Sequence, residues 1–450
     1  MTANKEGSTV ETPLEPFVKA TQSKNSRYER WRYTTFAVTW ITYAGFYLTR
    51  QSFSAAKAGI LEDPLVHVSK SMLGMVDAAY LIAYAIGQFI WGVAGDRFGC
   101  RKVVLTGILL SIVAGFAMGV SSVILLFGIF SFAQGIAQAS GWAPLTKNIG
   151  CWFSQKERGR IYGWWCSNYS IGPMVATPFA GYMAEHFTNW RYAFFIPAAT
   201  FLLIWFLALA FQRNKPEDVG LVGIEEYHCE CSTGLATPKE NVEDKESAWK
   251  GICNAFKNLM VLRLAVVYFL LKPARYALLL WGPLMVKEKL GKGMGESALI
   301  SALFMAAGPL GVLFAGYASD KLFNARRIPI CVISLVILAI ITCLFDVLTH
   351  SGSPFVMGLM LFAIGFLLFG PDSILVATAA VDFGTKRGAS TAVGLINGFG
   401  SAGAVLGGSL PGLISEKFGW GALFYSLAAC SFVAGALLLP KWNAVPAKEE

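Results

Sequence analysis

Two arginines stand inside long apolar stretches of this sequence, where a permanent charge is costly. Arg50 lies in GFYLTRQSF, near the end of the first stretch, and Arg275 lies near the centre of LLKPARYALLLW, 225 residues later. A guanidinium keeps its proton, and an unpaired one at mid-bilayer costs about 3 kcal/mol on insertion scales. Its planar fork of donors matches an oxyanion that accepts bidentate hydrogen bonds. The spacing, half the chain, predicts that two repeated units direct one cation each toward a shared anion.

Each arginine also has an interpretation without a ligand. Arg50 lies in the outer part of its stretch, so its side chain can snorkel to the membrane interface. Arg275 is too central for that, and it can instead pair with an intramembrane acid, either Asp77 or Asp372. Both alternatives stay open at this point. The matched positions of the two arginines favour an anion of the phosphate class.

Helical spacing indicates what else could line such a site. Tyr43 and Tyr47 share a helical face with Arg50, and Lys272 stands one turn before Arg275. Lys57, two turns beyond Arg50, either guides anions inward or is an ordinary interfacial lysine. Tyrosines at such spacing also occur as core or belt residues. The other residues predicted to bind substrate are Tyr84, Gln88, Trp142, Trp165, Asn168, Tyr169, Tyr276 and Asp372.

The composition is that of a membrane protein. Of 450 residues, 55% are hydrophobic and 14% charged, whereas soluble domains carry about 25% charged residues. Apolar windows of about 20 residues, each long enough to cross a bilayer, recur along the chain. We therefore predict an all-α membrane protein with twelve transmembrane helices. The predicted spans are 33–57, 71–94, 102–122, 124–147, 160–185, 190–212, 260–287, 296–318, 328–349, 354–381, 388–415 and 420–440.

Positive charge sorts by side of the membrane. Alternate connections and the N-terminal segment hold most arginines and lysines, which predicts that both termini face the cytoplasm. The net charge of +9 therefore indicates orientation, and no nucleic-acid partner is expected. The predicted organisation is a cytoplasmic tail (1–32), a six-helix bundle (33–212), a cytoplasmic linker (213–258), a second six-helix bundle (259–441) and a tail (442–450).

The two halves repeat each other. GVAGDRFGCRK begins at Gly92, and GYASDKLFNARR begins 224 positions later. KERG, ending at Gly159, is echoed by TKRG, ending at Gly388. Duplicated six-helix units place a substrate at their interface near mid-membrane, which is the layout of a transporter. No nucleophile with a base, nucleotide loop or metal cluster is apparent, so we expect no enzyme, no cofactor and no metal.

The loop between the second and third spans is a candidate conformational switch. Gly92 is expected to let two helices approach closely, and Asp96 to pair with Arg97, Arg101 or a neighbouring helix end. Asp320 is the repeat equivalent of Asp96. Such contacts would hold one conformation shut and break in the other. The alternative is a tight polar turn that satisfies helix ends.

Four stretches carry a resemblance to a known family: YLTRQSF, GWAPLTKNIGCWFSQKERG from Gly141, PEDVGLVGIEEY from Pro216, and ARYALLLW together with GFLLFGP. Along its full length the chain resembles the major facilitator superfamily, and within it the organophosphate:phosphate antiporter family. That family includes glycerol-3-phosphate and hexose-phosphate transporters. The resemblance implies that two arginines, one per half, bind phosphate, and these match Arg50 and Arg275.

The sequence departs from the family pattern at three positions. Gln88 stands where some members have a lysine, Tyr169 stands where the glycerol-phosphate branch has a histidine, and Lys272 replaces a tyrosine. One cation has thus moved from the second span to the seventh, which keeps the total positive charge. The phosphate expectation is unaffected, whereas the organic part is left open.

The resemblance implies an antiporter in a bacterial inner membrane, surrounded by lipid, that exchanges an organophosphate, above all a hexose 6-phosphate, for inorganic phosphate by alternating access. Two rival functions stay open. One is a transporter-like sensor that signals to a partner kinase. The other is a proton-coupled carrier of another organic anion with Asp77 or Asp372 as the proton site.

Overall fold

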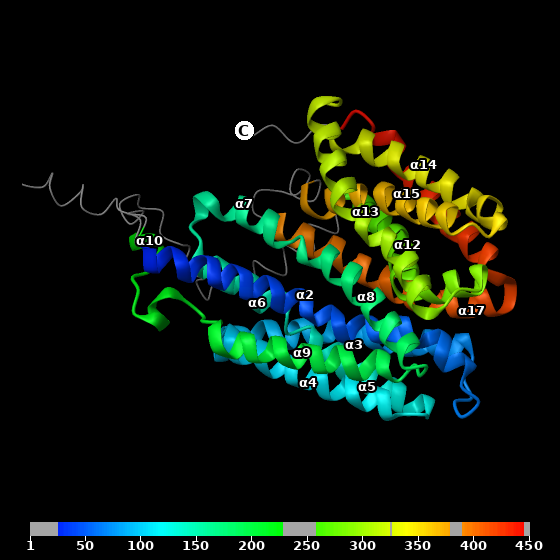
Figure 1. The fold of residues 1–450 in the computed structure, drawn as a ribbon. Coiled ribbons are helices and arrows are strands. Elements are labelled where there is room, and N and C mark those ends of the chain that lie inside the picture. The colour runs from blue at the N-terminus through cyan, green and yellow to red at the C-terminus, as the bar shows by residue number, and fades with distance from the viewer. Residues whose placement is uncertain (1–25, 228–257, 325, 379–388, 445–450) are drawn as a thin grey trace, which may run out of the picture.

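The computed structural model describes residues 26–227, 258–324, 326–378 and 389–444, and every regular element in these ranges is helical. Figure 1 shows the described helices in two bundles, α2 to α9 and α12 to α17. Residues 1–25 of the predicted tail 1–32, most of the predicted linker, the TKRG echo and residues 445–450 lie outside the described ranges, whereas residues 26–32 of that tail form the beginning of α2 (Ser26–Glu62).

The first bundle contains eight helical pieces at the six predicted positions. Its helices are α2 (Ser26–Glu62), α3 (Lys70–Phe98), α4 (Cys100–Val120), α5 (Ile124–Gln138), α6 (Trp142–Trp152), α7 (Gln155–Trp165), α8 (Asn168–His186) and α9 (Tyr192–Phe211). Short turns at 139–141 and 166–167 divide two of the predicted spans.

The second bundle matches the remaining six predicted positions. Its elements are α12 (Leu259–Leu290), α13 (Met294–Lys321), α14 (Arg327–Leu348), α15 (Pro354–Ser373), the π-helical η4 (Ile374–Thr378) and α17 (Ala389–Leu438). α17 contains a sharp bend at Gly419, whose φ of 79° and ψ of 172° are non-helical. This bend separates the last two predicted spans.

Nine helical segments of the described chain are long and apolar enough to cross a membrane. They are Lys70–Phe98, Cys100–Val120, Ile124–Trp152, Tyr192–Phe211, Leu259–Leu290, Met294–Lys321, Arg327–Ser351, Pro354–Val376 and Gly394–Lys441. The last of these covers two predicted spans. α2 and α8 are not in this group, and α2 carries Arg50, Lys57 and several buried threonines. The all-α membrane fold is confirmed, and the count of twelve spans stays a prediction.

The two bundles meet at one end of the molecule, where α8 packs on α13 and α3 packs on α17. Figure 1 shows the helices converging at this end, near the α2–α3 connection and the bend of α17. α3 and α17 approach so closely that a Cβ at Gly74 would lie 2.6 Å from the Ser409 carbonyl oxygen. Small residues permit such close helix contacts in membranes.

Polar contacts join the bundles at the same end. Their members are Lys287 and Glu62 (2.7 Å), Lys70 and Glu288 (2.7 Å), the Gly295 amide and Glu185 (2.7 Å), and the Ser71 amide and Glu416 (2.7 Å). We call this end, formed by the α2–α3, α8–α9 and α12–α13 connections, the closed end. The other end carries the α3–α4 connection and the residues after α9.

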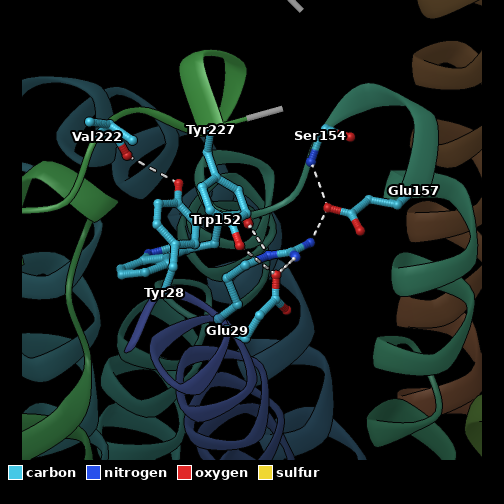
Figure 2. Close-up of polar contacts among 8 residues, drawn as sticks. Tyr28, Glu29, Trp152, Ser154, Glu157, Val222 and Tyr227 are labelled. Atoms are coloured by element: carbon cyan, nitrogen blue, oxygen red, sulfur yellow. Dashed lines mark hydrogen bonds and ion pairs between the residues drawn. The ribbon is translucent and has the colours of Figure 1, made fainter. Parts of the chain in front are cut away.

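The first part of the predicted linker packs against the first bundle. It contains η1 (Pro216–Val219) and α10 (Ile224–Tyr227). Figure 2 shows Tyr28 under Tyr227, with ring centroids 3.8 Å apart, and the Tyr28 hydroxyl donates to the Val222 carbonyl at 3.1 Å. Burial raises the pKa of the Tyr28 phenol to about 12, so it stays a donor at neutral pH. Residues 213–227 are therefore fixed to the start of α2.

A buried arginine extends the same contact region to α6 and α7. Arg32 donates to the Trp152 carbonyl at 3.2 Å, pairs with Glu29 at 2.8 Å and also pairs with Glu157. Glu157 accepts from the Ser154 amide at 3.1 Å, as Figure 2 shows. Two of the stretches that carry the family resemblance, the one from Gly141 and the one from Pro216, thus meet at the start of α2.

Candidate functional site

Arg50 and Arg275 line the same small cavity between the two bundles, with a volume of about 30 Å³. The first bundle contributes side chains from α2, α3 and α8, and the second contributes side chains from α12 and α13. The lining residues are Tyr47, Arg50, Tyr80, Leu81, Tyr84, Tyr169, Arg275, Tyr276, Leu279, Leu280 and Met305. A water molecule needs about 10–15 Å³ by this measure, so a sugar phosphate requires the walls to move apart.

The Nε of Arg50 is engaged in a hydrogen bond within the protein, whereas its Nη2 is available to a ligand. Its Nε donates to the Gln138 amide oxygen at 2.7 Å. Its guanidinium carbon lies 4.5 Å from the ring centre of Tyr47 and 4.9 Å from that of Tyr84. The buried Nη2 has no hydrogen-bond partner among the described residues. Because an unpaired buried donor is costly, a bound acceptor at this position would be stabilised.

Gln138 was not predicted from the sequence, although its amide group is the direct support of Arg50. It is the last residue of α5 and is fully buried. Its amide oxygen also accepts from the Tyr80 hydroxyl at 2.9 Å, and its amide nitrogen donates to Thr49 at 2.9 Å and Ser111 at 3.1 Å. All four hydrogen bonds of the amide are therefore used, which fixes the orientation of the arginine.

Arg275 has a carboxylate partner. Its Nη1 lies 2.7 Å from the Asp372 Oδ2, and its guanidinium carbon lies 4.8 Å from the Phe369 ring centre and 5.6 Å from that of Tyr169. Its buried Nε has no hydrogen-bond partner in the described part of the chain. Of the two intramembrane acids that the sequence offered as partners for Arg275, Asp372 forms the ion pair and Asp77 does not. Arg275 still lines the cavity.

Asp372 is shared between two cations. The Lys272 Nζ lies 3.0 Å from its Oδ1, on the side opposite the contact with Arg275. Lys272 and Asp372 are 8% and 7% exposed, and neither lines the cavity. Together with Arg50, the group contains three cations and one carboxylate, a formal charge of +2. This charge is the complement of a phosphate dianion.

The position of Lys57 differs from both positions that the sequence suggested. It is 0% exposed, forms an ion pair with Asp77 and donates to the Leu280 carbonyl at 2.9 Å. Its Nζ lies 3.8 Å from the Trp281 ring centre. In this conformation Lys57 is neither an interfacial lysine nor an anion guide at the surface. It is a paired charge packed between the bundles, because α12 covers this face of α2.

Several predicted ligands form a second layer behind the cavity wall. Tyr43 is buried, and its ring centre lies 5.2 Å from that of Trp142 and 5.7 Å from that of Trp165. Asn168 is fully buried, and both polar atoms of its side chain lack partners among the described residues. These residues do not line the cavity. Tyr47, Tyr84, Tyr169 and Tyr276 do line it.

Gln88 is exposed on α3 and is not part of the cavity wall. It follows the predicted stripe of α3, but its side chain lies beyond Tyr84 toward the end opposite the closed end. The structure therefore does not bring Gln88 together with Arg50 and Arg275.

The candidate switch residues lie at the end opposite the closed end, with different contacts from those predicted. Asp96 pairs with Lys147 of α6 at 2.5 Å, and not with Arg97 or Arg101. Arg97 instead covers the Phe98 ring at 5.4 Å.

The expectation for Gly92 was wrong, because a Cβ there would meet nothing within 4 Å. Asp320 pairs with Arg327 at 2.5 Å, across the α13–α14 connection. The Asp96 and Asp320 pairs thus each lie within one bundle.

Comparison with known proteins agrees with this architecture. Residues 39–407 match the sequence model of the Major Facilitator Superfamily. The chain is 31% identical to the glycerol-3-phosphate transporter of Bacillus subtilis over 432 residues, which cover 93% of this chain and 94% of that protein. It is 30% identical to a probable hexose phosphate transport protein of Chlamydia trachomatis, over 93% and 92% of the two chains.

Two further similarities concern a sensor and the fold. The chain is 27% identical to the membrane sensor protein UhpC of Escherichia coli, over 94% of this chain and 95% of that protein. It also superimposes on a bacterial homologue of the human lysosomal transporter Spinster with a TM-score of 0.69 at 14% identity, covering 94% and 96% of the chains. The second match shows the shared fold.

The match over most of the chain and the 30–31% identity to full-length phosphate-compound transporters agree with the sequence resemblance. They also agree with the prediction that the protein is not an enzyme. The chain belongs to the Major Facilitator Superfamily and, within it, to the organophosphate:phosphate antiporter family.

Proposed function

We propose that this protein exchanges an organophosphate, most specifically a hexose 6-phosphate, for inorganic phosphate across a bacterial inner membrane. The observation that carries the proposal is the shared cavity of Arg50 and Arg275, in which each guanidinium has a buried nitrogen without a partner among the described residues. Similarity to glycerol-3-phosphate and hexose phosphate transport proteins supports the substrate class.

In this proposal the two arginines bind the phosphate group from opposite bundles. Charge-assisted hydrogen bonds to a phosphate are short and strong, and a guanidinium fork can bind two oxygens at once. The hydroxyls of Tyr47, Tyr84 and Tyr276 line the same cavity and supply partners for the hydroxyl groups of a sugar. Binding of one dianion by both arginines draws the two bundles together.

Alternating access then follows from the arrangement of contacts between the bundles. We infer from the distribution of positive charge that both termini face the cytoplasm, which places the closed end on the periplasmic side. The described conformation is then inward-facing. Transport requires that the pairs Lys287–Glu62 and Lys70–Glu288 separate while the opposite ends of the bundles approach.

The direct test is exchange by purified protein in liposomes. Vesicles loaded with inorganic phosphate are expected to take up labelled phosphate and labelled hexose 6-phosphate, and vesicles without internal phosphate are not. A panel of hexose phosphates, glycerol phosphate and phosphoenolpyruvate as competitors ranks the organic substrates. Absence of any phosphate-dependent uptake by folded protein would contradict the proposal.

A sensor is the second candidate function, because the chain is also similar over its full length to the membrane sensor protein UhpC. The liposome experiment separates the two functions. A sensor binds hexose phosphate, detected by ligand-dependent thermal stabilisation, with little exchange. A transporter shows both binding and exchange.

A proton-coupled carrier is less compatible with the arrangement of acids. Asp77 pairs with Lys57, and Asp372 contacts both Lys272 and Arg275. In this conformation both acids are therefore already engaged in ion pairs, and both side chains are buried. Uptake that ignores internal phosphate but collapses when a protonophore removes the proton gradient would favour this carrier over the exchanger.

A further inference from the structure

Lys272 does not line the cavity, although it stands one turn before Arg275. Its aliphatic stem packs against α17, where the Cβ positions of Gly400 and Gly403 would lie 3.4 Å and 3.2 Å from its Cγ and Cβ. Its Nζ lies 4.5 Å from the ring centre of Tyr268 and 3.0 Å from the Asp372 Oδ1. The two glycines leave the space that this stem occupies, so Lys272 is positioned for Asp372.

Asp372 forms an ion pair with Arg275, the arginine of the second bundle that lines the cavity. One carboxylate oxygen contacts Arg275 at 2.7 Å, and the other contacts Lys272 at 3.0 Å. A phosphate that binds Arg275 must compete with this carboxylate, because both are anions seeking the same donors. Loss of Arg275 as a partner would strand a buried carboxylate unless another cation stayed beside it.

We propose that Asp372 is a built-in competitor for Arg275 and that Lys272 is a positioning residue that retains Asp372 when phosphate takes the arginine. This inference rests on the proposed function. Lys272 then contributes to phosphate binding without touching the phosphate. The pair also sets the charge of the site, which is +2 with both residues present and favours a dianion over a monoanion.

Charge counting separates this role from direct binding. Replacing Lys272 by methionine lowers the formal charge of the group to +1 and leaves Asp372 to hold Arg275 alone. Replacing Asp372 by asparagine raises the charge to +3. The double variant, Lys272→Met with Asp372→Asn, returns the charge to +2 and removes both the competitor and the residue that retains it.

The experiment measures KM and Vmax for phosphate exchange in liposomes for the wild type, the two single variants and the double variant. We expect Lys272→Met to raise KM by about tenfold or more. We expect Asp372→Asn to lower KM and to lower Vmax, because the substrate leaves a more positive site slowly. The double variant is expected to return KM to within about threefold of the wild type.

A direct role of Lys272 predicts the opposite for the double variant. If its KM stays as high as that of Lys272→Met, the lysine itself binds substrate and the inference fails. If Asp372→Asn does not fold, judged by size-exclusion profile, the comparison of Lys272→Met with the double variant still decides. Lys272→Gln with Asp372→Asn is the second version of that double variant.

The pH dependence of phosphate exchange tests independently whether the site prefers the phosphate dianion to the monoanion. Lys272→Met is expected to lose the wild-type preference for high pH, where phosphate is a dianion, and the double variant to regain it. An unchanged profile in Lys272→Met contradicts the inference. The matched control is Lys289→Met with Asp346→Asn, an ion pair near the closed end that does not line the cavity.

These outcomes also separate the inference from the function on which it rests. If the wild type exchanges no phosphate compound, the proposed function fails. If the wild type exchanges phosphate and the double variant shows no recovery, the function stands and only the role of Lys272 and Asp372 is overturned.

Discussion

The amide oxygen of Gln138 accepts a hydrogen bond from the Nε of Arg50 at 2.7 Å, and Gln138 is fully buried. The same amide oxygen also accepts from the Tyr80 hydroxyl, and the amide nitrogen donates to the hydroxyls of Thr49 and Ser111. The guanidinium is thereby oriented before any ligand arrives. Preorganised donors bind more tightly because less freedom is lost on binding.

Gln138→Leu should therefore raise KM for phosphate by about tenfold, because Arg50 loses the acceptor that orients it. Gln138→Glu should raise KM further, since a carboxylate beside Arg50 lowers the positive charge of the site. Liposome exchange kinetics measure both. Gln212→Leu, a buried glutamine that contacts Asn148 and not the cavity, is the control. An unchanged KM in both Gln138 variants would mean that Arg50 needs no such support.

Arg50→Lys and Arg275→Lys should each reduce exchange by about 10–100-fold, because an ammonium provides charge without the two-pronged fork. Initial rates at low substrate concentration are the readout. Arg191→Lys is a suitable control, since Arg191 donates to the Gly119 carbonyl at 2.8 Å away from the cavity. If Arg275→Lys exchanged phosphate at the wild-type rate, Arg275 would not be a phosphate ligand.

Linking the bundles at the closed end should stop transport. Glu62 and Lys287 contact each other across the bundles at 2.7 Å, so Glu62→Cys with Lys287→Cys accepts a short bifunctional thiol reagent. Exchange should fall to background after linking and recover when a cleavable reagent is reduced. The wild type treated in the same way controls for its own nine cysteines. Full exchange by the linked protein would show that this end does not open.

The pH dependence of exchange should follow the ionisation of phosphate. The second proton of a phosphate leaves at about pH 6–7, and a site of charge +2 favours the dianion. KM for total phosphate should therefore fall as pH rises from 5.5 to 8, by up to about tenfold. Parallel assays with sulfate, whose charge does not change in this range, separate the substrate from the protein. A flat profile for phosphate contradicts this reading.

Asp63 predicts a pH dependence of stability outside the membrane. The Trp190 indole donates to it at 2.8 Å and the Leu65 amide at 2.9 Å, and these bonds lower the pKa of the Asp63 carboxyl. A lowered folded-state pKa stabilises the protein above about pH 4, and this contribution is lost as pH falls through the folded value. Asp63→Asn should thus lower the melting temperature in detergent at pH 7, and the difference should shrink at pH 3.

Trp190→Phe removes the main donor and should show the same convergence with the wild type at low pH. A difference that stays constant from pH 7 to pH 3 would mean that the charge on Asp63 contributes nothing. The melting curves require protein that stays monodisperse over this range.

Sequence patterns located the helices well because apolar length and charged punctuation are local properties. Every predicted span overlaps a helical segment of the described chain, and residues 379–381 and 388 of the tenth and eleventh predicted spans lie outside it. The repeat offset placed Arg50 and Arg275 on one cavity, since duplicated bundles bring equivalent positions to a common axis. The breaks near Gly141 and Ser167 were not predicted, although Pro144, in the first turn of α6, is at a position where proline is tolerated at the start of a helix.

Contacts between helices were harder to predict, since they depend on rotation and register that one sequence does not state. Asp96 contacts Lys147, which stands 51 positions later, and Lys57 lies under α12 and not at the interface. Gln134 and Gln138 stand one turn apart in an otherwise largely apolar helix, but this spacing does not say which residues of other helices the two amides face. A search for buried amides facing an intramembrane arginine would have found it only with the helix pairing known.

The closed end is sealed by several separate polar pairs and close backbone contacts. Partly exposed pairs such as Lys70–Glu288 and Lys287–Glu62 are each worth about 0–1 kcal/mol. No single pair therefore acts as the lock, and losing one shifts the resting distribution of conformations only a few-fold. Each substitution at the closed end should therefore change the fraction of time that the transporter faces either compartment by a small amount. The arginine site, which lies elsewhere, would be unchanged.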